Sequence, residues 1–297
     1  MKRSFLEKLF DSILYIIMIF VIAITIYPFI NILAISFNES LDSIKGGIYL
    51  WPRKFTFENY TEIFKYANIG QALFISISRT VIGTLSGLIC SCMIAYTLSR
   101  KDYFLRRPIG ALLVITMYVS GGMIPEYMLI RQLNLVGKFW VYILPGLVWA
   151  FNVIVLRSFM ESLPYEIQES AKIDGANDLQ IFFKIVMPLC KPAIAVVALF
   201  IAVGQWNSWF DTYLYASNKA NLTTLQFEMM KILSNLSASQ NMAQRAAMAG
   251  MVAERNRISP ESVRMAITVV ATAPIIMIYP FIQKYFVSGM TIGAVKS

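Results

Sequence analysis

The segment ILYIIMIFVIAITIYPFINILAI, residues 13–35, is a nearly unbroken run of apolar side chains. A helix needs about 20 such residues to cross the hydrocarbon core of a bilayer, so this run is long enough to span a membrane. It is too long for the apolar core of a signal peptide and lacks a convincing small-residue cleavage site. We therefore expect it to be a membrane anchor.

The composition of the whole chain agrees with a membrane protein. Hydrophobic residues make up 57% of the 297 residues and charged residues 14%, and the mean hydropathy is +0.61. Soluble domains carry about 25% charged residues. We expect a single all-α polytopic membrane domain over residues 1–297. Its six predicted transmembrane helices lie near residues 13–35, 72–98, 109–130, 139–160, 193–215 and 263–285.

Basic residues in the short connections predict how the spans are oriented. Short loops rich in Lys and Arg lie in the cytoplasm. Such residues precede the first span, occupy the second and fourth connections and follow the sixth span: Lys2, Arg3, Lys8, Arg100, Lys101, Arg106, Arg107, Lys172, Lys184, Lys191, Lys284 and Lys296. Both termini are therefore expected in the cytoplasm and connections 37–71 and 216–262 outside. The same bias explains the net charge of +9 without a nucleic-acid partner.

The residue types present argue against catalysis by this chain. It has no histidine, which is the commonest metal ligand and a frequent general base. It also has no G-x-x-x-x-G-K-[ST] loop to hold phosphates. Cys90, Cys92 and Cys190 form no extracellular disulfide framework and are expected to be packing residues. We expect no metal site and no cofactor here, so nucleotide chemistry would belong to a partner protein.

The stretch PYEIQESAKIDGANDLQIFFKIVMP, residues 164–188, is a polar interruption between the fourth and fifth spans. Gly175 permits the left-handed turn that ends a helix, and Asn177 or Asp178 caps a second helix. The expected apolar stripe of that second helix consists of Leu179, Phe182, Phe183 and Val186. The pattern predicts a cytoplasmic helical hairpin that is either a docking surface for a protein or an amphipathic segment lying on lipid.

This hairpin resembles the EAA signature of ABC importer permeases, usually written E-A-A-x3-G-x9-I-x-L-P. The matching positions are Glu169, Ser170, Ala171, Gly175, Ile185 and Pro188. Ser170 replaces the second alanine and Met187 replaces the leucine, and both changes preserve size or apolarity. The resemblance to this family runs along nearly the whole chain.

Four further stretches resemble the sugar-importer, MalG-like branch of the family and, within it, the LplC-like subgroup that imports complex oligosaccharides. They are SGGMIPEYMLI (120–130), LPGLVWAFNVIVLRSFMESLP (144–164), GQWNSWFDTYLY (204–215) and YPFIQKYFVSGMTIGAVKS (279–297). The resemblance implies the type I importer permease fold, also called MetI-like. It also implies a bacterial plasma membrane as the location.

The resemblance further implies a set of partners. A second, homologous permease subunit would complete the pathway, an extracellular sugar-binding lipoprotein would deliver an oligosaccharide, and a cytoplasmic ATPase dimer would bind ATP and Mg. The hairpin would couple to that ATPase through Glu169, Ser170, Ala171, Asp174, Gly175, Ala176, Ile185 and Pro188. The C-terminal tail, with Gly293 and Lys296, would also reach the ATPase. The outer helix expected at residues 241–257 would contact the binding protein.

Several polar and aromatic residues of the spans are candidates for the substrate pathway: Asn152, Trp206, Asn207, Trp209 and Asp211. Aromatic faces, amides and carboxylates suit an oligosaccharide, although Trp also anchors helices at membrane interfaces. Arg79 lies inside the second span, where a charge is costly unless it faces protein or water. We expect Arg79 to stabilise packing against the partner permease rather than to line the pathway.

Three other functions compete with the importer hypothesis. An ion-gradient-driven secondary transporter would show inverted repeats or acidic residues within the spans, and such acids are scarce here. A membrane enzyme would need a catalytic constellation that the sequence does not show. A scaffolding protein would not need the hairpin motif. The secondary transporter is the main alternative.

Overall fold

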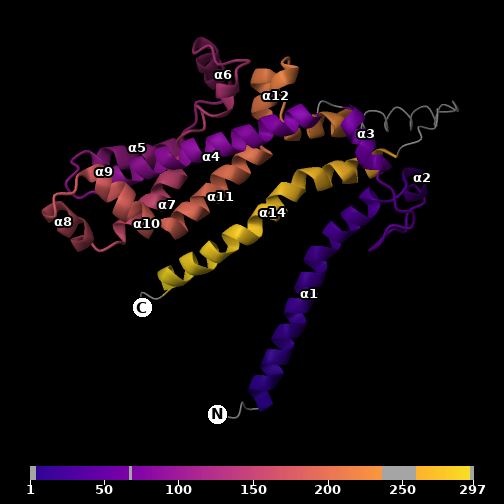
Figure 1. The fold of residues 1–297 in the computed structure, drawn as a ribbon, viewed down its shortest axis with the longest axis horizontal. Coiled ribbons are helices and arrows are strands. Elements are labelled where there is room, and N and C mark those ends of the chain that lie inside the picture. Colours follow the sequence, from indigo (N-terminus) through magenta and orange to yellow (C-terminus); the bar gives the residue numbers. More distant parts are fainter. Residues whose placement is uncertain (1–4, 67–68, 236–258, 295–297) are drawn as a thin grey trace. The chain divides into compact units, whose positions relative to one another are not determined.

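The computed structural model describes residues 5–66, 69–235 and 259–294, and within them it is all-helical, as predicted (Figure 1). The elements are α1 (Phe5–Ser36), α2 (Ser40–Ser43), α3 (Glu58–Tyr66), α4 (Ile69–Ser99), α5 (Arg106–Tyr118), α6 (Met123–Gln132), η1 (Phe139–Tyr142), α7 (Ala150–Glu161), α8 (Glu166–Ile173), α9 (Asp178–Gln180), η2 (Ile181–Val186), α10 (Met187–Leu189), α11 (Lys191–Asn207), α12 (Phe210–Ala216), η3 (Ala220–Leu222) and α14 (Pro260–Ala294). A further helix covers residues 225–235. The chain divides into two compact units, residues 1–69 with 231–274 and residues 70–230 with 275–297.

The first unit contains α1, which is apolar around its whole circumference. Its spanning window has a mean hydropathy of 2.7 and none of it is buried within the chain. After α1, the side-chain amides of two asparagines connect backbone segments. Asn38 Oδ1 accepts a hydrogen bond from the Lys54 N–H at 2.8 Å, and the Asn59 side chain donates to the Ser36 and Asn38 carbonyls. The side-chain hydrogen bond from Asn38 also lowers the pKa of Asp42. A fully exposed apolar helix needs lipid or another protein around it.

The described residues contain three helices that are long and apolar enough to span a membrane: Leu6–Ser36, Ile69–Ser99 and Glu261–Pro280. Two bent pairs are candidates for further spans. The chain bends by 117° between α5 and α6, and by 84° between Asp178–Leu189 and α11. The described part therefore has three to five candidate spans, and the count of six stays a prediction.

Glycine and proline explain why two expected spans are interrupted. Gly122, between α5 and α6, has a positive φ of 84°, a backbone conformation that breaks a right-handed helix. The region expected as one span over 139–160 contains only the short η1 and then α7, because Pro145 and Gly146 lie between them in non-helical backbone.

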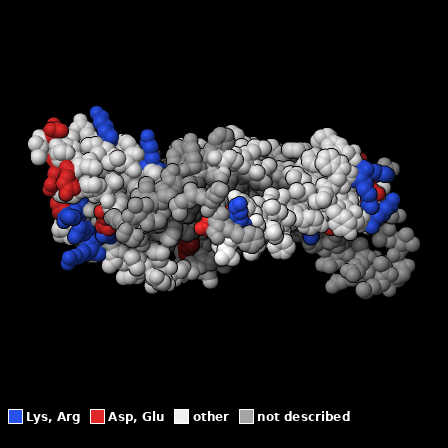
Figure 2. Space-filling view, turned by 90° about the horizontal axis from the view of Figure 1, so that it is seen from below, with Lys and Arg blue, Asp and Glu red and all other residues white. Residues whose placement is uncertain are grey.

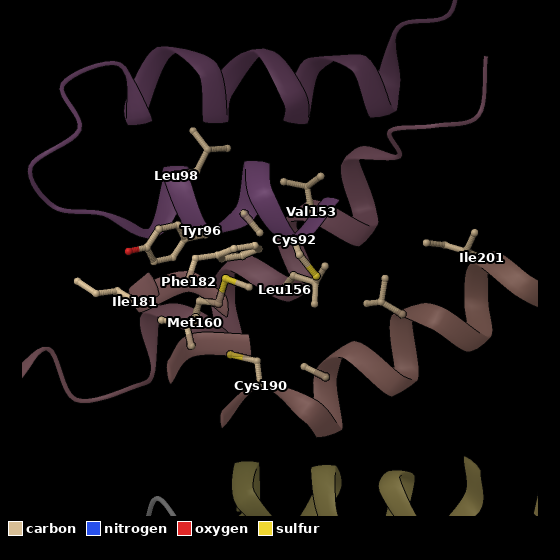
Figure 3. Packing of buried hydrophobic residues seen from close by; sticks show 14 of the residues in the cluster. Cys92, Tyr96, Leu98, Val153, Leu156, Met160, Ile181, Phe182, Cys190 and Ile201 are labelled. Atoms are coloured by element: carbon tan, nitrogen blue, oxygen red, sulfur yellow. The ribbon is translucent and has the colours of Figure 1, made fainter. Parts of the chain in front are cut away.

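The core of the second unit joins α4, α7, α11 and the 164–188 hairpin (Figure 3). Cys92, Tyr96 and Leu98 from α4 meet Val153 and Leu156 from α7 in a cluster of buried side chains. Ile181, Phe182 and Val186 enter the same cluster from η2, together with Cys190. The prediction that the cysteines pack is confirmed for Cys92 and Cys190, which are free and buried.

Two glycines let α4 approach its neighbours closely. Gly83 and Gly87 lie four residues apart, on one face of the helix. A Cβ atom at Gly83 would lie 2.8 Å from the Gln205 side chain, and one at Gly87 would lie 3.4 Å from the Leu147 carbonyl oxygen. This spacing of small residues is typical of helix contacts in membranes.

The hairpin packs through a π-helix, which changes the expected apolar stripe. In η2 the hydrogen bonds run from i to i+5, so residues five apart, such as Ile181 and Val186, share a face, and both are buried. Phe182 is 3% exposed, whereas Phe183 is 55% exposed and Leu179 is exposed as well. The stripe predicted from regular α-helical spacing is therefore wrong for Leu179 and Phe183.

The variants Phe182→Ala and Phe183→Ala should differ in stability. Removing a buried phenylalanine costs about 3–5 kcal/mol, while Phe183→Ala removes mainly one ring contact worth roughly 1 kcal/mol. Thermal unfolding of the detergent-purified subunit, followed by tryptophan fluorescence, measures both. Equal losses of stability would contradict the burial pattern set by the π-helix.

Candidate functional site

The tip of the 164–188 hairpin is built from two consecutive capping motifs. Gly175 has a φ of 81°, as the sequence predicted, and α8 ends in a Schellman motif. Its two bonds run from the Ala176 N–H to the Ala171 carbonyl at 2.9 Å and from the Gly175 N–H to the Lys172 carbonyl at 3.0 Å. This motif satisfies carbonyls at the end of α8 that would otherwise have no partner.

The second motif starts the next helix two residues later. The Gln180 N–H donates to Asn177 Oδ1 at 2.8 Å, and the Asn177 N–H donates to Gln180 Oε1 at 3.0 Å. This capping box confirms Asn177 as the helix cap. With a defined stop and start on each side of Gly175, the turn is stiff although its surface is exposed.

The hairpin has a buried inner face and an exposed outer face. Ala171 and Gln168 are buried on the inner face, and Ala176 and Ile185 are partly buried against the core cluster. The exposed predicted residues are Glu169, Ser170, Asp174, Gly175 and Pro188. Between these polar groups Ile173 is 86% exposed. The outer face thus combines carboxylates with a protruding apolar side chain.

Arg100, directly after α4, connects that helix to the hairpin. Its guanidinium donates to the Asp102 carboxylate at 2.8 and 3.1 Å and to the Tyr96 hydroxyl at 3.0 Å. The same side chain reaches Gln168 Oε1 of α8 and Asp178 Oδ1 of α9, both at 3.3 Å. Figure 2 shows charged side chains gathered at the end of the second unit where α8 and α9 lie.

Charge pairing fixes the protonation of this network. The hydrogen bonds from Arg100 hold the pKa of Asp102 well below its ordinary value, and the nearby charge of Lys172, 3.5 Å from the same carboxylate, lowers it further. The hydrogen bonds to Asp102 in turn raise the pKa of Arg100. Both groups therefore stay ionised at physiological pH.

A second feature of the same unit is a cavity of about 590 Å³. This size lies within the range of roughly 300–1,000 Å³ that is usual for ligand pockets. α4, α6, α7, α11, α12 and the η1 region all contribute to the wall. The lining residues are Arg79, Glu126, Val141, Tyr142, Pro145, Gly146, Trp149, Phe151, Asn152, Phe200, Ile201, Gly204, Gln205, Ser208, Asp211 and Tyr215.

Arg79 is the central polar group of this wall and is 2% exposed. It forms a two-pronged ion pair with the Asp211 carboxylate. Its Nε and Nη2 donate to Gln205 Oε1 at 3.1 and 3.0 Å, and its Nη1 donates to the Ser208 carbonyl at 3.3 Å. The guanidinium also lies 4.6 Å from the centre of the Tyr142 ring. Arg79 thus finds its partners within this chain, whereas packing against another subunit was expected.

Of the candidate pathway residues, the structure brings Asn152 and Asp211 to the cavity wall. Trp206 is buried outside the lining, and Trp209 makes an edge-to-face contact with Phe210 and a tilted ring contact with Tyr213. Asn207 is exposed and accepts a hydrogen bond from Gln226 at 3.3 Å. These three side chains belong to the surroundings of the cavity and not to its wall.

Sequence reasoning missed several lining residues, above all Gln205, Tyr142 and Glu126. The polar positions Gln205 and Glu126 fall within predicted spans or at their ends, which was the available signal. Tyr142 carried no signal, because an aromatic residue at a helix end is usually an interfacial anchor.

Three predicted contacts cannot be placed in the same way. Lys296 and the expected helix at 241–257 lie outside the described residues. Gly293 lies in the last turn of α14, which continues to Ala294, but the side chains around it lie outside the description as well.

The cavity wall combines two kinds of surface. Aromatic side chains, including Trp149 and Tyr215, supply apolar faces, and Asn152, Gln205 and Glu126 supply hydrogen-bonding groups. The three charges in the wall are Arg79, Asp211 and Glu126. Because Arg79 is already paired with Asp211, the wall as a whole is mildly acidic. It suits reversible binding through hydroxyl groups and contains no catalytic constellation.

No family model matches the chain. The chain is 39% identical to the polygalacturonan/rhamnogalacturonan transport system permease protein YtcP of Bacillus subtilis, over 98% of this chain and 99% of that protein. It is 37% identical to protein LplC of the same organism (92% and 90%) and 29% identical to the arabinooligosaccharides transport system permease protein AraQ of Halalkalibacterium halodurans (93% and 93%). A crystal structure of a bacterial ABC transporter that imports the acidic polysaccharide alginate contains a similar chain, with a TM-score of 0.80 and 29% identity, covering 96% of this chain and 99% of that one.

The Arg79–Asp211 pair makes a quantitative prediction. Removing one partner of a buried ion pair leaves an uncompensated charge and costs about 3–5 kcal/mol, so Arg79→Met and Asp211→Leu should each destabilise the purified subunit. The double variant Arg79→Met/Asp211→Leu should be more stable than either single variant, because it leaves no unpaired charge. Unfolding midpoints of the four proteins form a double-mutant cycle. Losses that simply add would contradict the pairing.

Proposed function

The chain belongs to the permease subunits of ABC carbohydrate importers, and from that premise we propose that it forms half of an ATP-driven import pathway for oligosaccharides. It is a membrane protein and not an enzyme. In this family ATP is hydrolysed by a separate subunit, so this chain supplies the path and the coupling surface.

The observation that carries the proposal is the construction of the 164–188 hairpin. Its turn is stiffened by a Schellman motif and a capping box, its base is anchored in the core by Phe182, and its outer face is exposed. A stiff element of this kind can transmit a push, because packed cores move between discrete arrangements and do not deform continuously. We propose that the outer face docks on a cytoplasmic ATPase dimer, which binds the ATP and Mg.

The docking residues of this proposal are the predicted motif positions together with Ile173, whose exposure the structure adds. Exposed Glu169, Ser170 and Asp174 face the ATPase, and Ile173 inserts between its side chains as an apolar anchor. Ala171, Ala176, Ile185 and Pro188 shape the hairpin from within or at its ends. Gly293 and Lys296 would add a second contact at the C-terminus.

The proposed topology has six spans with both termini in the cytoplasm, in a single permease domain over residues 1–297 of the type I importer fold. The basic residues near the hairpin and after α4 support this orientation. Connections 37–71 and 216–262 would then face an extracellular sugar-binding lipoprotein. Exposed apolar α1 would lie against lipid and a second, homologous permease subunit.

We propose that cargo passes along the cavity between α4, α7, α11 and α12. Asn152 and Asp211 lie in its wall, and the other three candidates, Trp206, Asn207 and Trp209, lie nearby in the sequence but outside the lining. The relatives are named for polygalacturonan, rhamnogalacturonan and arabino-oligosaccharides, which makes oligosaccharides from plant cell walls the first cargo to test. Among them the uncharged arabino-oligosaccharides suit the mildly acidic wall better than the carboxylate-bearing galacturonans. An ion-gradient-driven secondary transporter is the competing hypothesis.

The experiment that tests the function is reconstitution in proteoliposomes with the second permease, the ATPase and the binding protein. Import of labelled galacturonan, rhamnogalacturonan and arabinan oligosaccharides is measured with ATP, without ATP, and with an imposed proton or sodium gradient. ATP-dependent import that requires a loaded binding protein is the expected result. Import driven by the ion gradient alone would replace the proposal with the secondary transporter.

The variant Gly175→Arg should abolish ATP-driven import. A left-handed backbone costs a residue with a Cβ atom about 1–2 kcal/mol, and a long side chain at the tip would clash with the docked ATPase. The matched variant Gly175→Asn should retain most import, because asparagine tolerates this conformation and is small. Co-purification of the ATPase and import per ATP hydrolysed are the readouts. Normal uptake and normal assembly with Gly175→Arg would refute the docking role of the tip.

A further inference from the structure

Arg100 joins two parts of the second unit that are far apart in sequence, the end of α4 and the 164–188 hairpin. Its side chain is 7% exposed and contacts Tyr96 within α4, Asp102 in the following connection, and Gln168 and Asp178 on the two arms of the hairpin. A buried guanidinium with several simultaneous partners is held more rigidly than a surface ion pair. The hairpin is thus bound to α4 by directional polar contacts as well as by apolar packing.

α4 also carries the main polar group of the cavity. Arg79 lies about a third of the way along this helix from Ile69, roughly 30 Å from Arg100 at about 1.5 Å per residue. α4 is continuous from Ile69 to Ser99, and the described part of it contains no proline. A displacement at Arg100 would therefore move Arg79 and its partners Gln205 and Asp211 together with the helix.

We propose that Arg100 is a positioning residue that locks the hairpin to α4, so that movement of the hairpin on the ATPase is passed along α4 to the cavity. The inference rests on the proposed function, and it adds a defined mechanical link to it. Without the guanidinium, the hairpin would keep its apolar anchor at Phe182 but could rotate about that anchor. ATP hydrolysis would then continue while the cavity responds less.

The test uses the whole complex in proteoliposomes and compares Arg100→Gln with wild type. The matched control is Arg157→Gln. Among the ion pairs that the structure describes, Arg157 has one, with Glu161 of the same helix α7 at 2.9 Å. Import of the oligosaccharides named above is divided by ATP hydrolysed. We expect Arg100→Gln to lower this ratio roughly fivefold or more while the complex still assembles and hydrolyses ATP. Arg157→Gln should match wild type.

A spectroscopic readout reports the link directly. Spin labels are placed at the exposed positions Thr97 of α4 and Lys184 of η2, after the three native cysteines are replaced by alanine. In the wild-type background, the distance between the labels should be the same in the nucleotide-free and the ATP–vanadate-trapped complex. With Arg100→Gln it should broaden or change between these states. Arg100→Lys, which keeps the charge but loses the forked geometry, should fall in between.

A variant that leaves Arg100 in place covers the case in which Arg100→Gln does not assemble. Asp102→Asn/Asp178→Asn removes two exposed carboxylate partners, each more than half exposed, and should show the same two effects in weaker form. If import per ATP and the label distances are unchanged in the variants that assemble, the role of Arg100 is overturned and the proposed function still stands. Absence of ATP-dependent import by the wild-type complex would instead overturn the proposed function.

Discussion

Burial of Phe182 against Tyr96 and the side chains around them is the contact on which the second unit depends. α8 has only eight residues, and helices shorter than about 12–15 residues are marginal in water. The hairpin therefore owes its shape to this cluster and to its caps, not to helix propensity. The same side chains also hold α4, α7 and α11 together, so the core of the unit and the exposed hairpin are stabilised by one cluster of buried residues.

The cavity presents the opposite physical problem, because polar groups must persist where apolar packing is interrupted. Arg79 is tolerated there since its charge and its hydrogen-bonding capacity are largely taken up by Asp211, Gln205 and Ser208. Close approach of α4 at Gly83 brings Gln205 within reach of this network. The polar groups of the wall are thus held in place by one another before anything enters the cavity.

Features that depend on local sequence could be predicted, whereas those that depend on tertiary contacts could not. The helical fold, the turn at Gly175 and a helix cap at Asn177 or Asp178 follow from hydrophobicity and backbone preference alone, and the structure selects Asn177. The π-helix does not, because its extra residue is stabilised by packing of Ile181 and Phe182 against other helices. For the same reason the sequence marked Arg79 and Asp211 as unusual without revealing that they pair, and the polar position of Gln205 within a predicted span did not reveal that it joins them.

The π-helix also affects how the family can vary. It holds one residue more than an α-helix would over the same rise, and a single-residue deletion within Ile181–Val186 would restore α-helical geometry. Each residue of an α-helix turns the chain by about 100°. In a regular α-helix such a deletion would rotate everything beyond it, whereas here the π-helix already absorbs the extra residue, so the capped tip and α11 would keep nearly the same relation. Ile181–Val186 is therefore a segment in which the chain can lose one residue without re-orienting the hairpin relative to α11.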